Sequence, residues 1–224
     1  LSKTLVAAGL TALLSSAAFA AQVERVRGTV DKADGGTVTI KTDDGKTETV
    51  DVSGAKFAWV VPSSLDAIKD GVFIGTATKG ENPMTALEVV LFPESRRGTG
   101  EGHYGWDSIT DHTAGAGAKV KSAMTNGTVK ADAPATAPDV PLVKSAMTNG
   151  TVKAGGGGRE RTLTVDYGKG QTIQVLVPPQ APVVTFEPAD AKALSAGAKA
   201  FVVVAREDDG KVVARRVAVG KDGL

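Results

Sequence analysis

The chain has 224 residues, which is enough for one or two domains. Its 26 lysines and arginines against 25 acidic residues leave a formal net charge of +1, so it carries no electrostatic footprint for nucleic acid or for an anionic lipid surface. The sequence holds no cysteine, which excludes disulfides and thiolate metal sites and leaves the fold to depend on its apolar core.

Residues 1–20 have the pattern of a signal peptide. Lys3 precedes an apolar stretch over residues 5–20 that ends in Ala18-Phe19-Ala20, the small-x-small pattern of a signal peptidase site. We predict cleavage after Ala20 and a soluble mature protein in the periplasm. A retained anchor is the alternative, but this stretch is shorter than the roughly 20 apolar residues that a bilayer requires. No other segment is apolar enough to cross a membrane, which argues against a permease.

Residues 22–93 are expected to form a first β-module. The Thr- and Val-rich runs at 37–42 and 47–52, joined by a turn with Gly45, predict a hairpin. Ser63 or Ser64 can cap a short helical turn that Gly71 ends. In that turn, the side chains expected to face the core are Leu65 and Ile68. The strands expected in this module are 26–30, 37–42, 47–52, 57–61, 72–78 and 85–92.

Residues 143–222 are expected to form a second module in which the same order of elements is repeated. The run TVTIKTDDGKTETVDV at 37–52 is matched by TLTVDYGKGQTIQVLV at 162–177. Further along, Pro62, Ile68 and Gly71 are matched by Pro188, Leu194 and Gly197. The expected elements are strands 148–153, 162–167, 171–177, 183–186, 199–205 and 211–219, with a short helix near 189–194.

The sequence therefore predicts an all-β chain of two tandem homologous modules, each a small β-barrel of OB-like or related type with one short helical turn. A module of this size leaves much of its surface in water. We expect the two modules to pack on each other, and two independent modules on a linker are the alternative.

Residues 94–142 form a linker that contains a second, shorter duplication. The twelve letters VKSAMTNGTVKA occur at 120–131 and again, unchanged, at 143–154. We predict that the later copy supplies the first strand of the second module, because it runs directly into that module's hairpin. The earlier copy, together with the Ala- and Pro-rich residues 131–141, is then expected to be a mobile insertion.

The segment FPESRRGTGEGHYGWD at 92–107 gathers much of the chain's chemistry. It is interrupted by glycines, so we predict a loop and not a strand. It resembles the signature FPE, RGTGEGHY and WD of a family of uncharacterised exported bacterial proteins with two small β-modules of unknown function. Gly105 departs from the proline that this family has between Tyr and Trp. Members are often labelled automatically as metal ABC transporter permeases, so the resemblance leaves an accessory role in metal handling open.

Three interpretations of this segment and the residues that follow it stay open. In the first, Tyr104 and Trp106 pack over the seam between the modules, while His103, Glu101 and Arg97 hydrogen-bond the loop backbone. In the second, the loop lines a groove for a small ligand or an envelope protein; the residues assigned to this groove are Arg97, Glu101, Tyr104 and Trp106. In the third, imidazoles and carboxylates hold zinc, copper or nickel; the ligands assigned are His103, Asp107 and His112, with Glu101 and Asp111 as further donors.

Other chemistry receives little support from the sequence. The run GTGEG at 98–102 lacks the GxxxxGK[ST] pattern of a phosphate loop, and no GxSxG elbow is present. In Arg215-Arg216, a structural salt bridge is favoured over a binding patch. We therefore expect a non-enzymatic binding or structural protein without a cofactor, with a periplasmic accessory in metal handling as the alternative and a hydrolytic enzyme third. No nucleic acid partner and no membrane span after cleavage are expected.

Overall fold

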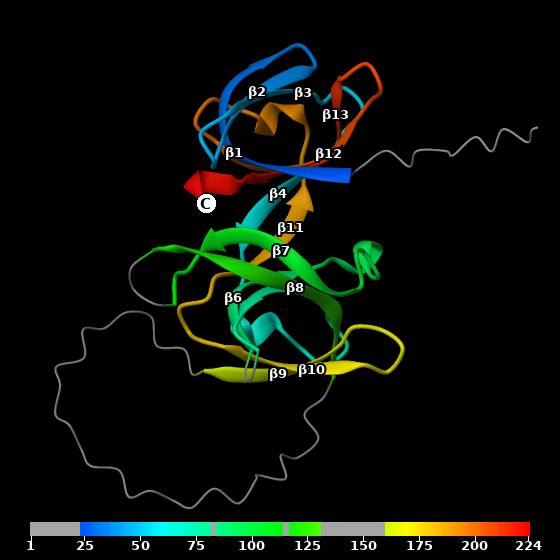
Figure 1. The fold of residues 1–224 in the computed structure, drawn as a ribbon. Helices are drawn as coiled ribbons and strands as arrows, with labels where there is room; N and C mark the ends of the chain where they lie inside the picture. The colour runs from blue at the N-terminus through cyan, green and yellow to red at the C-terminus, as the bar shows by residue number, and fades with distance from the viewer. Residues whose placement is uncertain (1–22, 82–83, 114–116, 131–159) are drawn as a thin grey trace, which may run out of the picture.

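The computed structural model describes residues 23–81, 84–113, 117–130 and 160–224. In these residues the chain is all-β, which confirms the predicted class (Figure 1). The strands are β1 (Val23–Asp34), β2 (Thr37–Thr42), β3 (Thr47–Asp51), β4 (Lys56–Pro62), β5 (Phe73–Lys79), β6 (Met84–Leu91), β7 (Gly102–Thr110), β8 (Lys119–Lys130), β9 (Arg161–Asp166), β10 (Thr172–Val177), β11 (Val183–Pro188), β12 (Lys199–Arg206) and β13 (Val212–Gly220). No helix in the described part of the chain is long and apolar enough to cross a membrane. The predicted signal peptide lies outside the described residues.

The four helical pieces are single 3₁₀ turns of three residues each: η1 (Leu65–Ala67), η2 (Glu94–Arg96), η3 (Ala191–Ala193) and η4 (Lys221–Gly223). Ile68 is fully buried after η1, as predicted. The predicted serine cap is wrong, because Ser64 holds the N-cap position without a side-chain hydrogen bond. In η3, by contrast, the Asp190 carboxylate accepts a hydrogen bond from the backbone N–H of Lys192 at 2.8 Å.

The first barrel is closed by five strands from both ends of the chain. Strands β1, β2 and β3 follow one another as antiparallel neighbours, and β1 also pairs with β12. The ring closes through β12, β13 and the parallel pair Val213 and Asp51. Its interior is filled mostly by valines, the β-branched residues that pack well on a pleated surface, such as Val30, Val38 and Val202.

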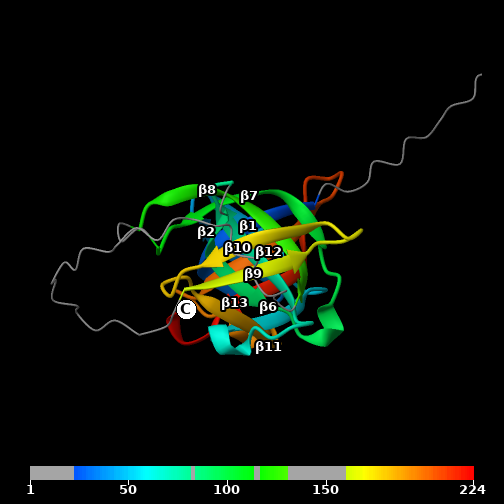
Figure 2. The same cartoon turned by 90° about the horizontal axis from the view of Figure 1, so that it is seen from below.

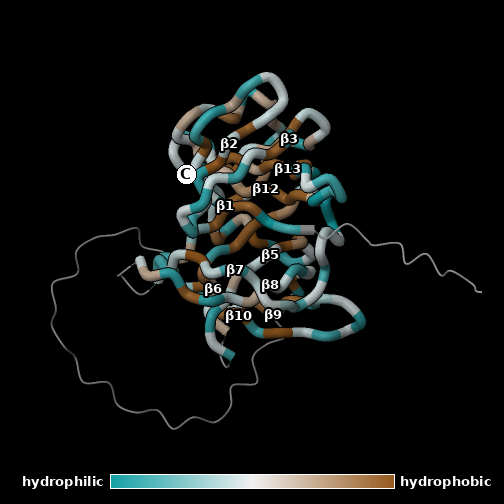
Figure 3. Tube along the Cα trace, turned by 45° about the horizontal axis from the view of Figure 1, so that its top comes forward, coloured by the Kyte–Doolittle hydropathy of each residue, from teal (hydrophilic) through white to brown (hydrophobic). Residues whose placement is uncertain are grey.

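The second barrel has the same plan with other strands. Strands β8, β9 and β10 are antiparallel neighbours, and β5 and β6 complete the ring. Closure is again parallel, where Val175 and Leu176 of β10 meet Met84 and Thr85 of β6. Figure 2, seen from below, brings β9 and β10 to the front. Figure 3 shows hydrophobic residues concentrated in the strands of both barrels.

Strands β4 and β11 connect the barrels. They pair antiparallel with each other, with Val60 opposite Phe186, and β4 continues along β13 while β11 continues along β6. In Figure 1 they lie between the two barrels. The chain passes from one barrel to the other along each of these strands. The hairpin of β5 and β6, which follows β4, therefore belongs to the second barrel, and the hairpin of β12 and β13, which follows β11, belongs to the first. Each barrel therefore takes three strands from one half of the chain and two from the other, and neither coincides with the predicted modules 22–93 and 143–222.

The first copy of the twelve-residue repeat is strand β8, so its prediction as a mobile insertion is wrong. Its residues pair with β5, β7 and β9, and Ser122 to Gly127 are buried apart from half-buried Ala123. The Ala- and Pro-rich residues 131–141 and the later copy at 143–154 lie outside the described residues, so their predicted roles, a mobile insertion and a first strand, stay predictions. The earlier copy pairs with β9 although the later copy lies closer to β9 in the sequence. The entropic cost of closing a loop grows only slowly with loop length, so the longer connection is no obstacle to this pairing.

Residues 102–110 form strand β7, so the predicted loop is wrong over this stretch. Glycine lowers strand propensity, but here Gly102 and Gly105 are held by pairing with β8 opposite Asn126 and Ala123. The register of the pairing with β8 shifts between Gly105 and Ser108, so Trp106 lies within a β-bulge. The strand thereby turns its two aromatic side chains toward the seam between the barrels.

Candidate functional site

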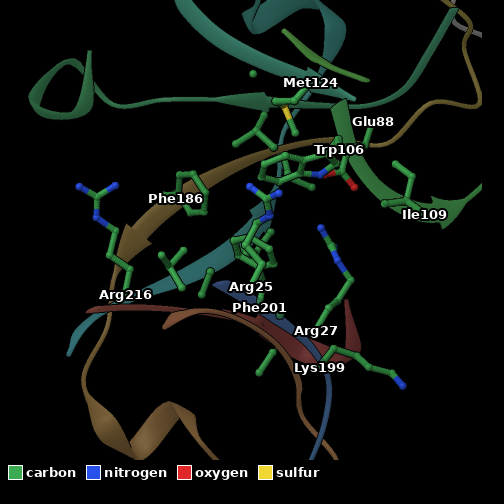
Figure 4. Close-up of a pocket in the computed structure, with 18 of the residues that line it drawn as sticks. Arg25, Arg27, Glu88, Trp106, Ile109, Met124, Phe186, Lys199, Phe201 and Arg216 are labelled. Carbon is green, nitrogen blue, oxygen red and sulfur yellow. The ribbon is translucent and has the colours of Figure 1, made fainter. Parts of the chain in front are cut away.

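A pocket of about 960 Å³ lies at the seam between the two barrels (Figure 4). Strands β1, β12 and β13 of the first barrel line one side, β5, β6 and β8 of the second line the other, and β7 contributes aromatic side chains. Its aromatic residues are Phe92, Tyr104, Trp106, Phe186 and Phe201. Its basic residues are Arg25, Arg27, Arg96, Lys119, Lys199 and Arg216, and its acidic residues are Asp43 and Glu88.

The two aromatic side chains of β7 are fixed by contacts with β8 and with each other. The Asn126 side-chain amide donates a hydrogen bond to the Tyr104 hydroxyl at 3.2 Å, and that hydroxyl donates one to the Gly100 carbonyl, also at 3.2 Å. Tyr104 and Trp106 meet edge to face with ring centroids 6.0 Å apart. Burial raises the pKa of Tyr104, so its hydroxyl stays protonated and polar but uncharged.

Strand β1 presents two arginines to the pocket. Side chains alternate along a strand, so Arg25 and Arg27 share the face opposite buried Val26. The Arg25 guanidinium lies 4.2 Å from the centroid of the Trp106 ring and 3.6 Å from the Asp107 carboxylate. The Arg27 guanidinium lies 4.8 Å from the centroid of Phe201. Both cations therefore stand on aromatic faces, and the partial burial of Arg27 strengthens its attraction to the ring.

A second pair of arginines stands at Phe186. The Arg96 guanidinium lies 5.1 Å from the centroid of that ring. Burial, and then the nearby positive charge of Arg216, lower the pKa of Arg96. In the described part of the chain the arginines that form ion pairs are Arg25, Arg97 and Arg206. Arg96 and Arg216 thus stand close enough to repel each other without a described carboxylate between them.

Three buried polar atoms at this pocket have no hydrogen-bond partner among the described residues. They are Arg27 Nε, Trp106 Nε1 and Asn126 Oδ1. Leaving a buried donor or acceptor unpaired costs about 1–3 kcal/mol, more for a charged group, so such atoms are uncommon in native proteins and call for a reason. All three residues line the pocket.

The predicted groove residues divide between the pocket and its surroundings. Tyr104 and Trp106 line it, whereas Arg97 and Glu101 are exposed and do not. The Arg97 guanidinium forms a two-point ion pair with Glu94, at 2.5 and 2.8 Å, and donates to the Gly71 carbonyl at 2.7 Å. This ion pair lowers the pKa of Glu94. Arg97 therefore ties the η2 loop to the start of β5.

The structure does not bring the predicted metal ligands together. His103 is exposed with Nδ1 2.8 Å from the Thr125 hydroxyl, Asp107 faces Arg25, and His112 is exposed at the pocket. Asp111 is buried and pairs with the Lys79 ammonium at 2.5 Å, which lowers its pKa to about 2. Among residues 23–81, 84–113, 117–130 and 160–224, no cluster of three or more such side chains could hold a metal ion.

The sequence patterns did not lead us to predict the basic residues that line the pocket, Arg25, Arg27, Arg96, Lys119, Lys199 and Arg216, which we call its basic wall. Its signal is the alternation Arg-Val-Arg at 25–27, which places two arginines on one face of a strand. The preference for a salt bridge at Arg215-Arg216 is wrong, because neither residue pairs with a carboxylate in the described part of the chain, and Arg216 lines the pocket. Neither a family model nor a curated protein nor a solved structure matches this chain.

Proposed function

We propose that this protein is an exported, non-enzymatic binding protein that holds a small molecule with an apolar body and an acidic group in the pocket between its barrels. The observation that carries the proposal is the pair of buried, unpartnered donors, Arg27 Nε and Trp106 Nε1, at an aromatic-lined pocket. Export follows from the expected signal peptide, which lies outside the described residues.

The size and lining of the pocket support a small ligand. Small-molecule pockets typically span roughly 300–1,000 Å³ and are mostly apolar with a few placed polar groups, and this pocket has about 960 Å³. The rings of Phe92, Phe186 and Phe201 offer apolar area for the body of the ligand. These rings lose little conformational entropy when they bind, since they are already packed against one another or against cations.

The charge of the lining supports an acidic ligand. Six basic side chains face the pocket and two acidic ones do, and of the two acids Asp43 is paired with Lys119 at 3.0 Å. Hydrogen bonds from arginine to a carboxylate, sulfonate or phosphate are about twice as strong as those between neutral groups. Both donors have almost no exposed area, so we propose that the Arg27 and Trp106 side chains move slightly to donate hydrogen bonds to the anion.

Fluorescence titration with 8-anilinonaphthalene-1-sulfonate tests the proposal, because this probe combines an acidic group with an aromatic body. We expect saturable binding, displacement of the probe by dodecanoate, and binding at least about tenfold weaker in Arg27→Asn, as expected for a hydrogen bond to a charged group. Arg215→Asn is the matched control, since Arg215 is exposed on β13 and does not line the pocket. Equal affinity in wild type and Arg27→Asn, with unchanged circular dichroism, would overturn the proposal.

A further inference from the structure

We infer that the ligand is an elongated molecule with an acidic group at each end and an apolar middle. This inference rests on the proposed function and specifies the chemistry of the same pocket. It follows from the arrangement of the pocket's cations, which form two groups with apolar residues between them.

The first group belongs to β1. Arg25 and Arg27 stand over Trp106 and Phe201, and Arg27 Nε and Trp106 Nε1 are the unpartnered buried donors there. The second group joins two other elements, Arg96 of η2 and Arg216 of β13, at Phe186. Figure 4 shows Arg216 beside Phe186 on one side of the pocket, Arg27 on the opposite side, and Arg25 between them below Trp106.

The pocket also has apolar lining residues. Val60 of β4 and Val184 of β11 line it where these strands cross the seam, together with Phe92 and Ala218. Phe92 and Phe186 pack with ring centroids 5.7 Å apart. A chain of methylene groups or a flat ring system fits these residues, because burying apolar area against them favours binding. A molecule with one acidic group would leave one pair of arginines unmatched.

The two ends differ in the charges around them. At the first end Asp107 lies near Arg25, and Glu88 also lines that part of the pocket, on the side of Trp106. At the second end, burial and then the positive charge of Arg216 lower the pKa of Arg96, and neither arginine forms an ion pair among the described residues. An anion placed between these two guanidiniums removes their repulsion as well as adding attraction.

Calorimetric titration with straight-chain α,ω-dicarboxylates, each beside the monocarboxylate of the same length, tests this inference. We expect one range of chain lengths in which the dicarboxylate binds at least about tenfold tighter, since each charged hydrogen bond contributes enough for such a factor. This ratio should fall to about two, the statistical factor for two equivalent ends, in both Arg216→Gln and Arg27→Asn. It should stay unchanged in Arg215→Gln, whose exposed side chain does not line the pocket.

The outcomes separate the two proposals. If mono- and dicarboxylates bind equally at every length while Arg27→Asn weakens both, the proposed function stands and the second acidic end is overturned. A dicarboxylate advantage that survives Arg216→Gln also overturns it. If neither class binds to the wild type, both proposals fail.

Discussion

The two barrels are alike where their backbones pack and differ where they face the pocket. Both close through a short parallel contact, and both have a hairpin with a register shift at the same place, between Ala77 and Thr78 in β5 and between Val203 and Val204 in β12. Gly28 and Gly127 begin the same triplet, Gly-Thr-Val, on β1 and β8. These shared features are ones that the barrel geometry demands.

The two barrels differ in the side chains that they contribute to the pocket. Arg27, opposite Phe201 on β12, corresponds to Asn126, opposite Gly75 on β5. Arg216 corresponds in the same way to Glu88, because each is the last paired residue before its register shift. At these two positions the first barrel therefore carries arginine, and the second carries asparagine or glutamate. Since the barrel geometry demands neither set, we attribute the basic wall to binding.

The largest effect is expected where the barrels are alike. A Cβ atom on Gly28 would lie 2.1 Å from the Lys41 carbonyl oxygen, and one on Gly127 would lie 2.2 Å from that of Asp166. Both contacts are with backbone, so strands would have to separate. We expect Gly28→Ala and Gly127→Ala each to destabilise the protein by about 3 kcal/mol, measured by urea unfolding.

Gly54→Ala is the control for these variants, because a Cβ there meets no atom within 4 Å. Since the strands of the barrels are continuous through β4 and β11, we also expect one unfolding transition in each variant. A loss in Gly28→Ala alone, with Gly127→Ala close to wild type, would contradict the equivalence of the two barrels.

Exchanging the pocket side chains should remove binding without comparable loss of stability. The double variant Arg27→Asn, Arg216→Glu gives the first barrel the residues of the second. We expect its affinity for a dicarboxylate to fall by about a hundredfold or more, roughly 2.7 kcal/mol. The urea midpoint should change little, because Arg216 is exposed and Arg27 half-buried. A fall in stability as large as that of Gly127→Ala would show instead that these arginines maintain the fold.

Deleting residues 131–153 should make the β8–β9 connection resemble the short β1–β2 connection of the first barrel. Lys130 would then be followed by Ala154, and β8 would keep its whole sequence. The connection shortens by roughly a factor of four, which by loop-closure entropy stabilises the protein by about 1 kcal/mol. Urea unfolding of the deletion variant measures this. A large destabilisation would mean that the removed residues take part in the fold.

An ion pair that only the second barrel has should give a small dependence of stability on pH. Asp111 pairs with Lys79. In the first barrel, the residue at the position equivalent to Lys79 is Ala205. The pKa of Asp111 is lowered from 3.8 to about 2, chiefly by Lys79. The pair therefore stabilises the folded state above about pH 4, and this contribution is lost as the pH falls toward 2.

Asp111→Asn should be less stable than wild type at neutral pH, and the difference should shrink as the pH falls from about 4 to about 2. Unfolding midpoints across this range measure it. A difference that does not depend on pH would show that the Lys79 contact does not act through the charge of Asp111.

Most strands could be predicted from alternation and turn residues, because these are local signals. The run 37–42 matches β2 to the residue, and the paired glycines and prolines placed the turns. The assignment of strands to barrels could not be predicted, because no local sequence pattern shows that β4 and β11 cross from one barrel to the other. Strand β7 was missed because its glycines lower strand propensity, while its pairing with β8 depends on contacts distant in sequence.

The site was predicted in part. Tyr104 and Trp106 were found because aromatic side chains in a Gly-rich segment are unusual. Their partners Arg25, Phe201 and Arg216 lie far along the chain, and only the barrel closure through β1, β12 and β13 brings them together. The closely spaced His103, Asp107 and His112 stay apart, because the register of β7 shifts between Gly105 and Ser108, where Asp107 lies, and His112 lies beyond the end of that strand.

The most direct test of the account is an NMR titration that observes the two tryptophan indole N–H groups. Trp106 Nε1 is buried without a partner at the pocket, whereas Trp59 packs against the first barrel's core. On addition of dodecanedioate we predict a downfield shift of the Trp106 indole proton, as it donates to the carboxylate, with the Trp59 signal unchanged. A Trp106 signal that does not move while the ligand binds would contradict the assignment of these donors to a ligand.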